Sequence, residues 1–96
     1  MIRHIVMWKL KPEHARENAL EIKRRLEALV GVVPELLFCE VGLNAGRDRN
    51  PFDLALVADF ADLDALERYR VHPAHRAVAA FVHEVAEDRH VVDYEK

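Results

Sequence analysis

Residues 69–78, YRVHPAHRAV, place a phenol and two imidazoles within seven residues, with a proline between the two histidines. Proline is common in the first turn of a helix, so we expect Pro73 to begin one, with His72 at its N-cap and His75 in its first turn. The partial positive charge of a helix N-terminus disfavours an imidazolium, and a neutral imidazole accepts protons. His75 is therefore predicted to have the properties of a general base.

A third candidate, His4, lies in the N-terminal segment IRHIVMWKL, which is predicted to be a strand from Ile2 to Leu10. The residues on the same strand face as His4 are Ile2, Val6, Trp8 and Leu10. If this row faces the helices, His4 lines one cavity with Tyr69 and His75. Two neutral imidazoles and a phenol in an apolar cleft suit proton removal next to a carbonyl, with the phenol stabilising the developing oxyanion. The alternative is a set of half-buried polar groups bonded to the backbone.

The walls of the predicted cleft are apolar. We expect the binding residues to be Val6, Trp8, Leu26, Leu54, Leu56, Val78 and Val91. A metal site fits less well, because the proline splays His72 and His75 and zinc needs three or four ligands. Cys39 lies in a predicted strand, where a small buried side chain is simpler than a nucleophile. We therefore expect no metal and no other cofactor.

The elements that position these side chains follow from the apolar periodicity. After the first strand, apolar residues recur at helical spacing from Ala15 to Val33. Residues 36–43 and 52–60 are predicted strands joined by a polar loop, and Asp62 is predicted to cap a short helix. A second helical piece begins at Pro73, and residues 89–94 form the last strand. The order β-α-β-β-α-β is that of the α+β ferredoxin-like fold, with a four-stranded antiparallel sheet.

The second face of this sheet is also apolar. Two helices cover one face, yet Ile5, Met7, Ala55 and Val57 point the other way. If these side chains were in contact with solvent, a large apolar patch would be exposed, so we expect a homodimer packed sheet against sheet. The alternative is a monomer with an open apolar face.

The composition is that of an ordinary globular domain. The 96 residues predict a single domain over residues 1–96, with 51% hydrophobic and 32% charged residues. A net charge of -3 without a basic run gives no reason to expect nucleic acid as a partner. One cysteine cannot form an internal disulfide, and no apolar run reaches the length of a membrane span or of a signal peptide core. We expect a cytoplasmic protein that does not associate with membranes.

A histidine in the first strand, together with Y-x-x-H-P-x-H opening the last helix, resembles the stress-responsive A/B barrel (Dabb) family over essentially the full chain. The resemblance implies a dimer joined through its sheets into an α+β barrel. One plant member is a cofactor-free polyketide cyclase that works by aldol condensation. By that resemblance His75 is the base, Tyr69 supports it and His4 is the strand histidine. That cyclase has a pocket histidine where this chain has Leu54 and a pocket tyrosine where it has Leu26, which implies a different substrate.

These observations predict a homodimer whose pocket takes a hydrophobic, oxygenated small molecule, with a cofactor-independent cyclisation or related proton transfer as the reaction. Two alternatives stay open. One is a non-enzymatic dimer that binds a ligand or resists stress; the other is a cofactor-free oxygenase that uses Trp8 and Tyr69. A closed cavity filled by Leu26, Trp8 and Phe81 favours the non-enzymatic alternative. An open cleft that reaches His75 favours a site.

Overall fold

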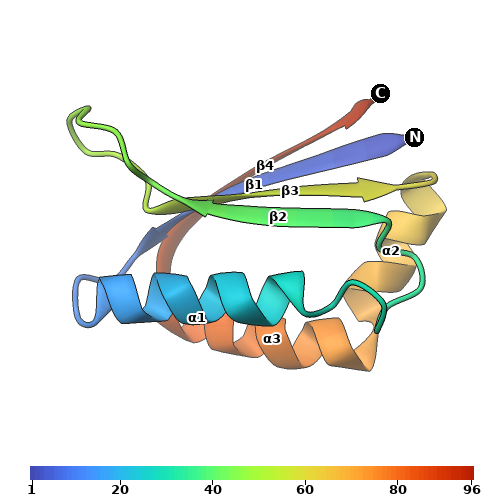
Figure 1. Cartoon of the computed structure of the whole chain (residues 1–96), viewed down its shortest axis with the longest axis horizontal. Coiled ribbons are helices and arrows are strands. Elements are labelled where there is room, and N and C mark those ends of the chain that lie inside the picture. The colour runs from blue at the N-terminus through green and yellow to red at the C-terminus, as the bar shows by residue number, and fades with distance from the viewer.

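Four strands and three helices follow one another in the computed structural model, which describes residues 1–96. They are β1 (Ile2–Leu10), α1 (Ala15–Glu27), β2 (Phe38–Leu43), β3 (Leu54–Phe60), α2 (Leu63–Val71), α3 (Pro73–Val85) and β4 (Ala86–Glu95). The strands form one antiparallel sheet in the order β2-β3-β1-β4, and the helices lie on one side of it (Figure 1). The predicted ferredoxin-like fold is confirmed, with its second helix divided into α2 and α3.

Two side-chain caps divide the second helical segment. The carboxylate of Asp62 accepts a hydrogen bond from the Ala65 backbone nitrogen at 2.8 Å and begins α2. His72 has extended backbone angles, as expected for a residue that precedes proline, and its Nδ1 accepts from the Ala74 backbone nitrogen at 3.0 Å. The predicted N-cap at His72 therefore starts α3, and the chain changes direction there.

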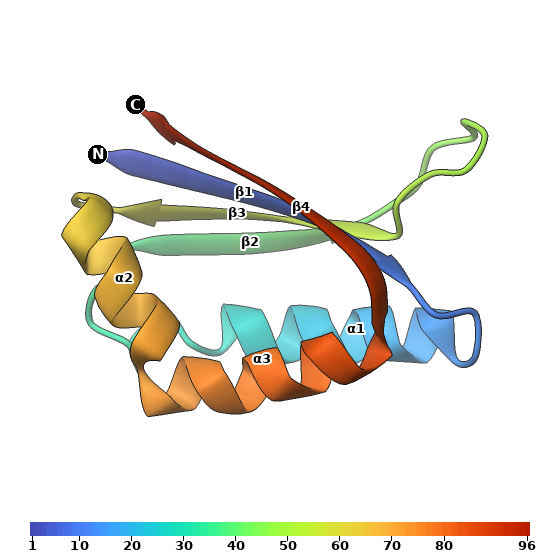
Figure 2. The ribbon, with the colours of Figure 1, turned by 180° about the vertical axis from the view of Figure 1, so that it is seen from behind.

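Some boundaries differ from the predicted ones. The first helix ends at Glu27 rather than near Val33, because the chain then forms turns in which Gly31 adopts a φ of 87°. In the sheet, β2 and β3 each begin two residues later than predicted. β4 begins at Ala86, three residues earlier than predicted, and follows α3 without a loop at the sheet edge beside β1 (Figure 2).

The core lies between the sheet and the helices. All five residues of the predicted inward row of β1, including His4, are buried. They pack with the buried apolar residues of α1, such as Ile22 and Leu26, and with those of α2 and α3, such as Leu66 and Val82. The row therefore faces the helices, which was the condition for His4 to share a cavity with Tyr69 and His75.

No helix covers the other face of the sheet (Figures 1 and 2). We call this the open face; its apolar residues are Ile5, Met7, Phe38, Ala55, Val57, Val92 and Tyr94. Met7, Phe38, Val92 and Tyr94 are between 42% and 54% exposed. Its polar residues include an ion pair in which Arg3 donates to both carboxylate oxygens of Asp59, at 2.8 and 2.9 Å.

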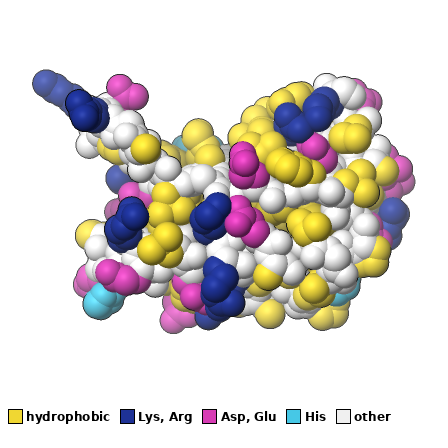
Figure 3. All heavy atoms as spheres, viewed as in Figure 1, with side chains coloured by type: hydrophobic (Ala, Val, Ile, Leu, Met, Phe, Trp, Pro, Cys, Tyr) yellow, Lys and Arg dark blue, Asp and Glu magenta, His cyan; other side chains and the backbone are white.

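The surface view shows hydrophobic side chains at the upper right, where the ends of the strands lie (Figure 3). Basic side chains lie at the tip of the projecting β2–β3 loop, which carries Arg47 and Arg49.

None of the helices is long and apolar enough to cross a membrane.

Candidate functional site

A cavity of about 540 Å³ lies between the sheet and the helices, within the range typical of small-molecule sites. Seven of the ten predicted site residues line it: His4, Val6, Trp8, Leu26, Leu56, Tyr69 and His75. The cavity reaches His75, and Phe81 does not line it, because the Phe81 ring packs under the guanidinium of Arg25 at 4.3 Å. Leu26 and Trp8 thus form walls and do not fill the space.

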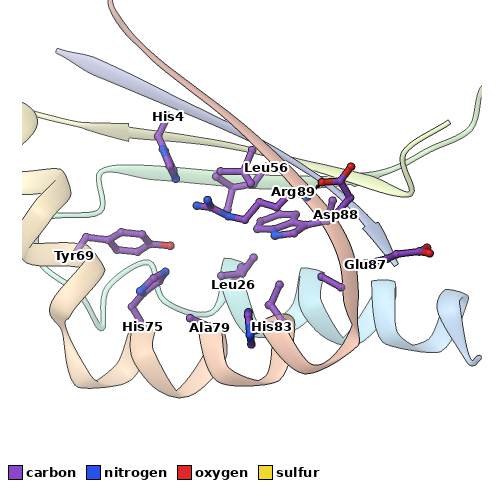
Figure 4. Close-up of a pocket in the computed structure, with 14 residues that line it drawn as sticks. His4, Leu26, Leu56, Tyr69, His75, Ala79, His83, Glu87, Asp88 and Arg89 are labelled. Atoms are coloured by element: carbon purple, nitrogen blue, oxygen red, sulfur yellow. Dashed lines mark hydrogen bonds between the residues drawn. The ribbon is translucent and has the colours of Figure 1, made fainter. Parts of the chain in front are cut away.

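The three predicted catalytic side chains come from three different elements. His4 projects from β1, Tyr69 from the last turn of α2 and His75 from the first turn of α3, and all point into the cavity (Figure 4). The ring centroids of Tyr69 and His75 are 4.2 Å apart. The Tyr69 ring also packs on Phe60, which in turn meets the edge of the His4 ring. The break between α2 and α3 therefore brings the phenol beside the imidazole.

A backbone hydrogen bond fixes the tautomer of His75. Its Nδ1 lies 3.1 Å from the carbonyl oxygen of Arg70. A carbonyl only accepts, so Nδ1 carries the hydrogen and Nε2 of the neutral ring keeps its lone pair. Burial lowers the pKa of His75, the nearby His4, Arg70 and Arg89 lower it further, and the bond to Arg70 opposes them. His75 is thus neutral at pH 7, and its Nε2 is able to accept a proton.

His4 is oriented by a carboxylate. Its Nδ1 contacts a carboxylate oxygen of Asp93 on β4, and the other oxygen of Asp93 lies 3.6 Å from the guanidinium of Arg70. An ionised carboxylate accepts, so Nδ1 of His4 carries the hydrogen and Nε2 is free. Burial lowers the pKa of His4 even though Asp93 acts to raise it. Both histidines therefore present an unprotonated Nε2.

The hydroxyl of Tyr69 is a free hydrogen-bond donor. The residue is 2% exposed, yet its oxygen makes no hydrogen bond within the chain and points into the cavity (Figure 4). Burial raises the pKa of the phenol, so the group stays protonated at neutral pH. A donor that opens onto a cavity and has no partner in the chain can bond to a ligand oxygen on which negative charge develops.

Three predicted binding residues lie outside the cavity wall. Leu54 and Val78 are buried in the core, at 2% and 8% exposure. Val91 pairs with Val6 across the sheet, but the edge position of β4 leaves it 38% exposed. Cys39 is half-buried and packs against the core, and burial raises its thiol pKa to about 12, which makes it a poor nucleophile.

The remaining lining residues come from the end of α3 and the start of β4, and sequence reasoning missed them. They are Ala79, Val82, His83, Ala86, Glu87, Asp88 and Arg89. Because β4 was predicted to begin at Arg89, the residues before it were not placed at a site. The alternation of side chains between the two faces of the last strand could have identified Arg89 and Asp93. They pair with Trp8 and His4, and therefore lie on the same face of the sheet as these residues.

The chain is thus an α+β protein of the ferredoxin-like class. Between its sheet and helices lies a cavity with apolar walls, into which two histidines and a tyrosine point. The family model described as the stress responsive A/B barrel domain, Dabb, matches residues 2–96, and the chain belongs to this family. An uncharacterized protein of Streptomyces coelicolor is 36% identical over 88 residues, which cover 90% of this chain and 91% of that protein.

Solved structures agree with the fold. The crystal structure of a dimeric protein of unknown function with a ferredoxin-like fold, from Bacteroides fragilis, superposes with a TM-score of 0.90 at 32% identity, covering 99% of this chain and 95% of that one. A hydroxynitrile lyase from Passiflora edulis gives a TM-score of 0.85 at 22% identity, covering 97% and 90%. At that identity the likeness is one of fold alone.

Proposed function

We propose that the chain forms a homodimer through its open face. Met7, Val92 and Tyr94 are exposed there, and burying apolar side chains of this kind contributes about 25 cal/mol per Å². The dimeric relative from Bacteroides fragilis supports the proposal, since it is similar over nearly the whole chain. A two-fold axis through the open face would leave the cavity, which lies on the other side of the sheet, one to each subunit.

We further propose that each cavity binds an apolar, oxygenated small molecule and removes a proton next to its carbonyl group without a cofactor. The observation that carries this proposal is the bond from Nδ1 of His75 to the Arg70 carbonyl, because it leaves Nε2 as the basic atom of a neutral ring. The cavity has the volume of a small-molecule site, and its walls at Val6, Leu26 and Leu56 are apolar.

The chemistry is a proton transfer followed by carbon–carbon bond formation. Nε2 of His75 takes the α-proton, and the Tyr69 hydroxyl donates a hydrogen bond to the carbonyl oxygen as it becomes an enolate. The enolate carbon attacks a second carbonyl of the same molecule. The imidazolium then returns its proton to the new alkoxide, so the product is an aldol isomer of the substrate. His4 is proposed to bind the second oxygen or to relay this proton.

The chief competing function is ligand binding without turnover. It uses the same cavity and differs in one respect, which is that His75 never exchanges a proton with the ligand. A cofactor-free oxygenase is a weaker alternative, favoured by the presence of both Trp8 and Tyr69 in the cavity lining. Exchange of a ligand's α-hydrogens with solvent distinguishes ligand binding without turnover from the proposed enzyme, because only the enzyme accelerates it.

The test follows deuterium incorporation. Aryl methyl ketones such as acetophenone are incubated with the protein in D₂O, and loss of the methyl signal is followed by proton NMR. We expect exchange faster than the buffer rate, and a return to the buffer rate in His75→Ala. The matched control is His14→Asn. His14 is the exposed N-cap residue of α1, and asparagine tolerates its backbone φ of 57°. Ketone binding without accelerated exchange would leave a binding protein and remove the enzyme proposal.

A further inference from the structure

Arg89 is a cation that faces the cavity without a carboxylate partner. It pairs with Trp8 across the sheet, so its side chain lies on the face of β4 turned toward the helices, and it lines the cavity. Figure 4 shows the guanidinium extending away from the cavity rim in the direction of His4 and Tyr69. The ion pairs of the chain include five arginines but not Arg89: Arg3, Arg24, Arg25, Arg68 and Arg70.

None of the nearby carboxylates forms an ion pair with Arg89. Asp88 accepts a hydrogen bond from the backbone nitrogen of Arg89 at 2.8 Å, and its other oxygen lies 3.6 Å from His90. Asp93 is shared between His4 and Arg70. In Figure 4 the carboxylates of Glu87 and Asp88 point away from the guanidinium. Arg89 therefore keeps a guanidinium without an ion pair, although the more distant charge of Asp93 acts on it.

Arg89 is the one cationic side chain that lines the cavity, and the Tyr69 hydroxyl is a second hydrogen-bond donor there. His4 and His75 are neutral, Tyr69 is a donor, and the charge of Arg89 acts to lower the pKa of both histidines. Arg89 is exposed at the cavity rim, and its partial burial lowers its pKa, with Arg70 acting in the same direction and Asp93 against it. A partly desolvated guanidinium presents a planar pair of donors that matches a carboxylate, and the bond is stronger there than in water.

We propose that the ligand of this cavity carries a carboxylate, which Arg89 binds, while its apolar body lies against Trp8 and Leu26. The proposal rests on the proposed function, since it requires that the cavity holds a small molecule, and it specifies the class of that molecule as an apolar organic acid. Arg89 is then the specificity-determining residue. It orients the acid with its charged end at the β4 wall and its remaining carbons toward His75.

The test uses pairs of probes that differ only in charge: benzoate, 4-butylbenzoate, hexanoate and 2-naphthoate, each with its neutral primary amide. Trp8 is the single tryptophan and lines the cavity, so its fluorescence reports binding, with the two naphthyl probes followed by calorimetry. We expect at least one acid to bind about tenfold to a hundredfold more tightly than its amide, the range for a charge-assisted hydrogen bond. Arg89→Gln removes this preference and Arg89→Lys keeps part of it.

Arg16→Gln is the matched control, because Arg16 is exposed on α1, has no ion pair and lies outside the cavity. It keeps the preference of the wild-type protein for the acid. If acid and amide bind the wild-type protein equally, the carboxylate proposal is overturned while the small-molecule site stands. If an acid is preferred but Arg89→Gln keeps the preference, Arg89 is the wrong residue and the proposal is also overturned. If no probe of any pair binds, both this proposal and the proposed function fail.

Discussion

His75 is held by the backbone carbonyl of Arg70, with 3.1 Å between Nδ1 and the oxygen, and the break between α2 and α3 is what frees that carbonyl. In a continuous helix the Arg70 oxygen would accept from the backbone nitrogen four residues on, at Ala74. Here the Ala74 nitrogen donates to the side chain of His72 instead. The HPxH sequence therefore serves two purposes: its first histidine caps α3, and its second takes up the carbonyl left free at the end of α2.

The first prediction is an acidic limb in the pH dependence of the proposed exchange reaction. Only neutral His75 accepts a proton, and burial lowers its pKa below the usual 6.5. We expect the rate to be independent of pH near neutrality and to fall only below pH 6.5, with a midpoint equal to the His75 pKa. Histidine titration by two-dimensional NMR gives that pKa independently. A midpoint above 6.5 would contradict the assignment of His75 as a buried base.

The second prediction concerns stability in the same pH range. Because His4 and His75 both have lowered pKa values in the folded state, the unfolded chain binds more protons just below pH 6.5. The free energy of unfolding should therefore be largest above 6.5 and fall as the pH drops toward the two folded-state pKa values. Urea unfolding at several pH values measures this slope, which should be smaller in His75→Ala. An unchanged slope in that variant would mean that His75 titrates as a solvent-exposed group.

The third prediction tests how Asp93 orients His4. Asparagine removes the charge that raises the pKa of His4 but not the burial that lowers it, so Asp93→Asn should lower this pKa further. The amide can also donate to Nδ1 and thereby select the other tautomer. Nitrogen-15 shifts of the ring, measured by NMR, distinguish the two tautomers. An unchanged His4 pKa would show that the Asp93 contact is not maintained in solution.

The periodicity of apolar residues was sufficient to predict the fold and the position of His4, Tyr69 and His75 around one cavity. The inward row of β1, the cap at His72 and the side of α3 that carries His75 all follow from spacing and from the conformation of proline. The opposite wall could not be derived in the same way. Whether Asp93 reaches His4, or Arg89 the cavity, depends on the register between the first and last strands, which are more than 80 residues apart. Leu54 and Val78 lie on the predicted inward faces of their strand and helix, but they are buried in the core and do not reach the cavity.

The fourth prediction separates the stability and activity effects of one hydroxyl. The Tyr69 oxygen has no hydrogen-bond partner in the chain, while its ring packs on Phe60 and His75. Tyr69→Phe keeps these ring contacts, so the free energy of unfolding should change by less than about 1 kcal/mol. If the hydroxyl stabilises the developing oxyanion, the exchange rate should fall roughly a hundredfold, as when a single oxyanion donor is removed. A stable variant with undiminished exchange would exclude this role for the phenol.

The fifth prediction concerns the proposed dimer. Met7 lies in the middle of the open face and pairs with Ala55 and His90 across the sheet. Met7→Asp would bury a carboxylate in the proposed interface, and a two-fold axis would place it there twice, at a cost of the order of several kcal/mol. We expect the wild-type protein to sediment as a dimer at micromolar concentration and Met7→Asp as a monomer. Leu20→Asp is the control, because Leu20 is 47% exposed on α1, away from the open face, and this variant should remain dimeric. A wild-type monomer, or a Met7→Asp dimer as stable as the wild-type one, would show that the open face is not where two chains meet.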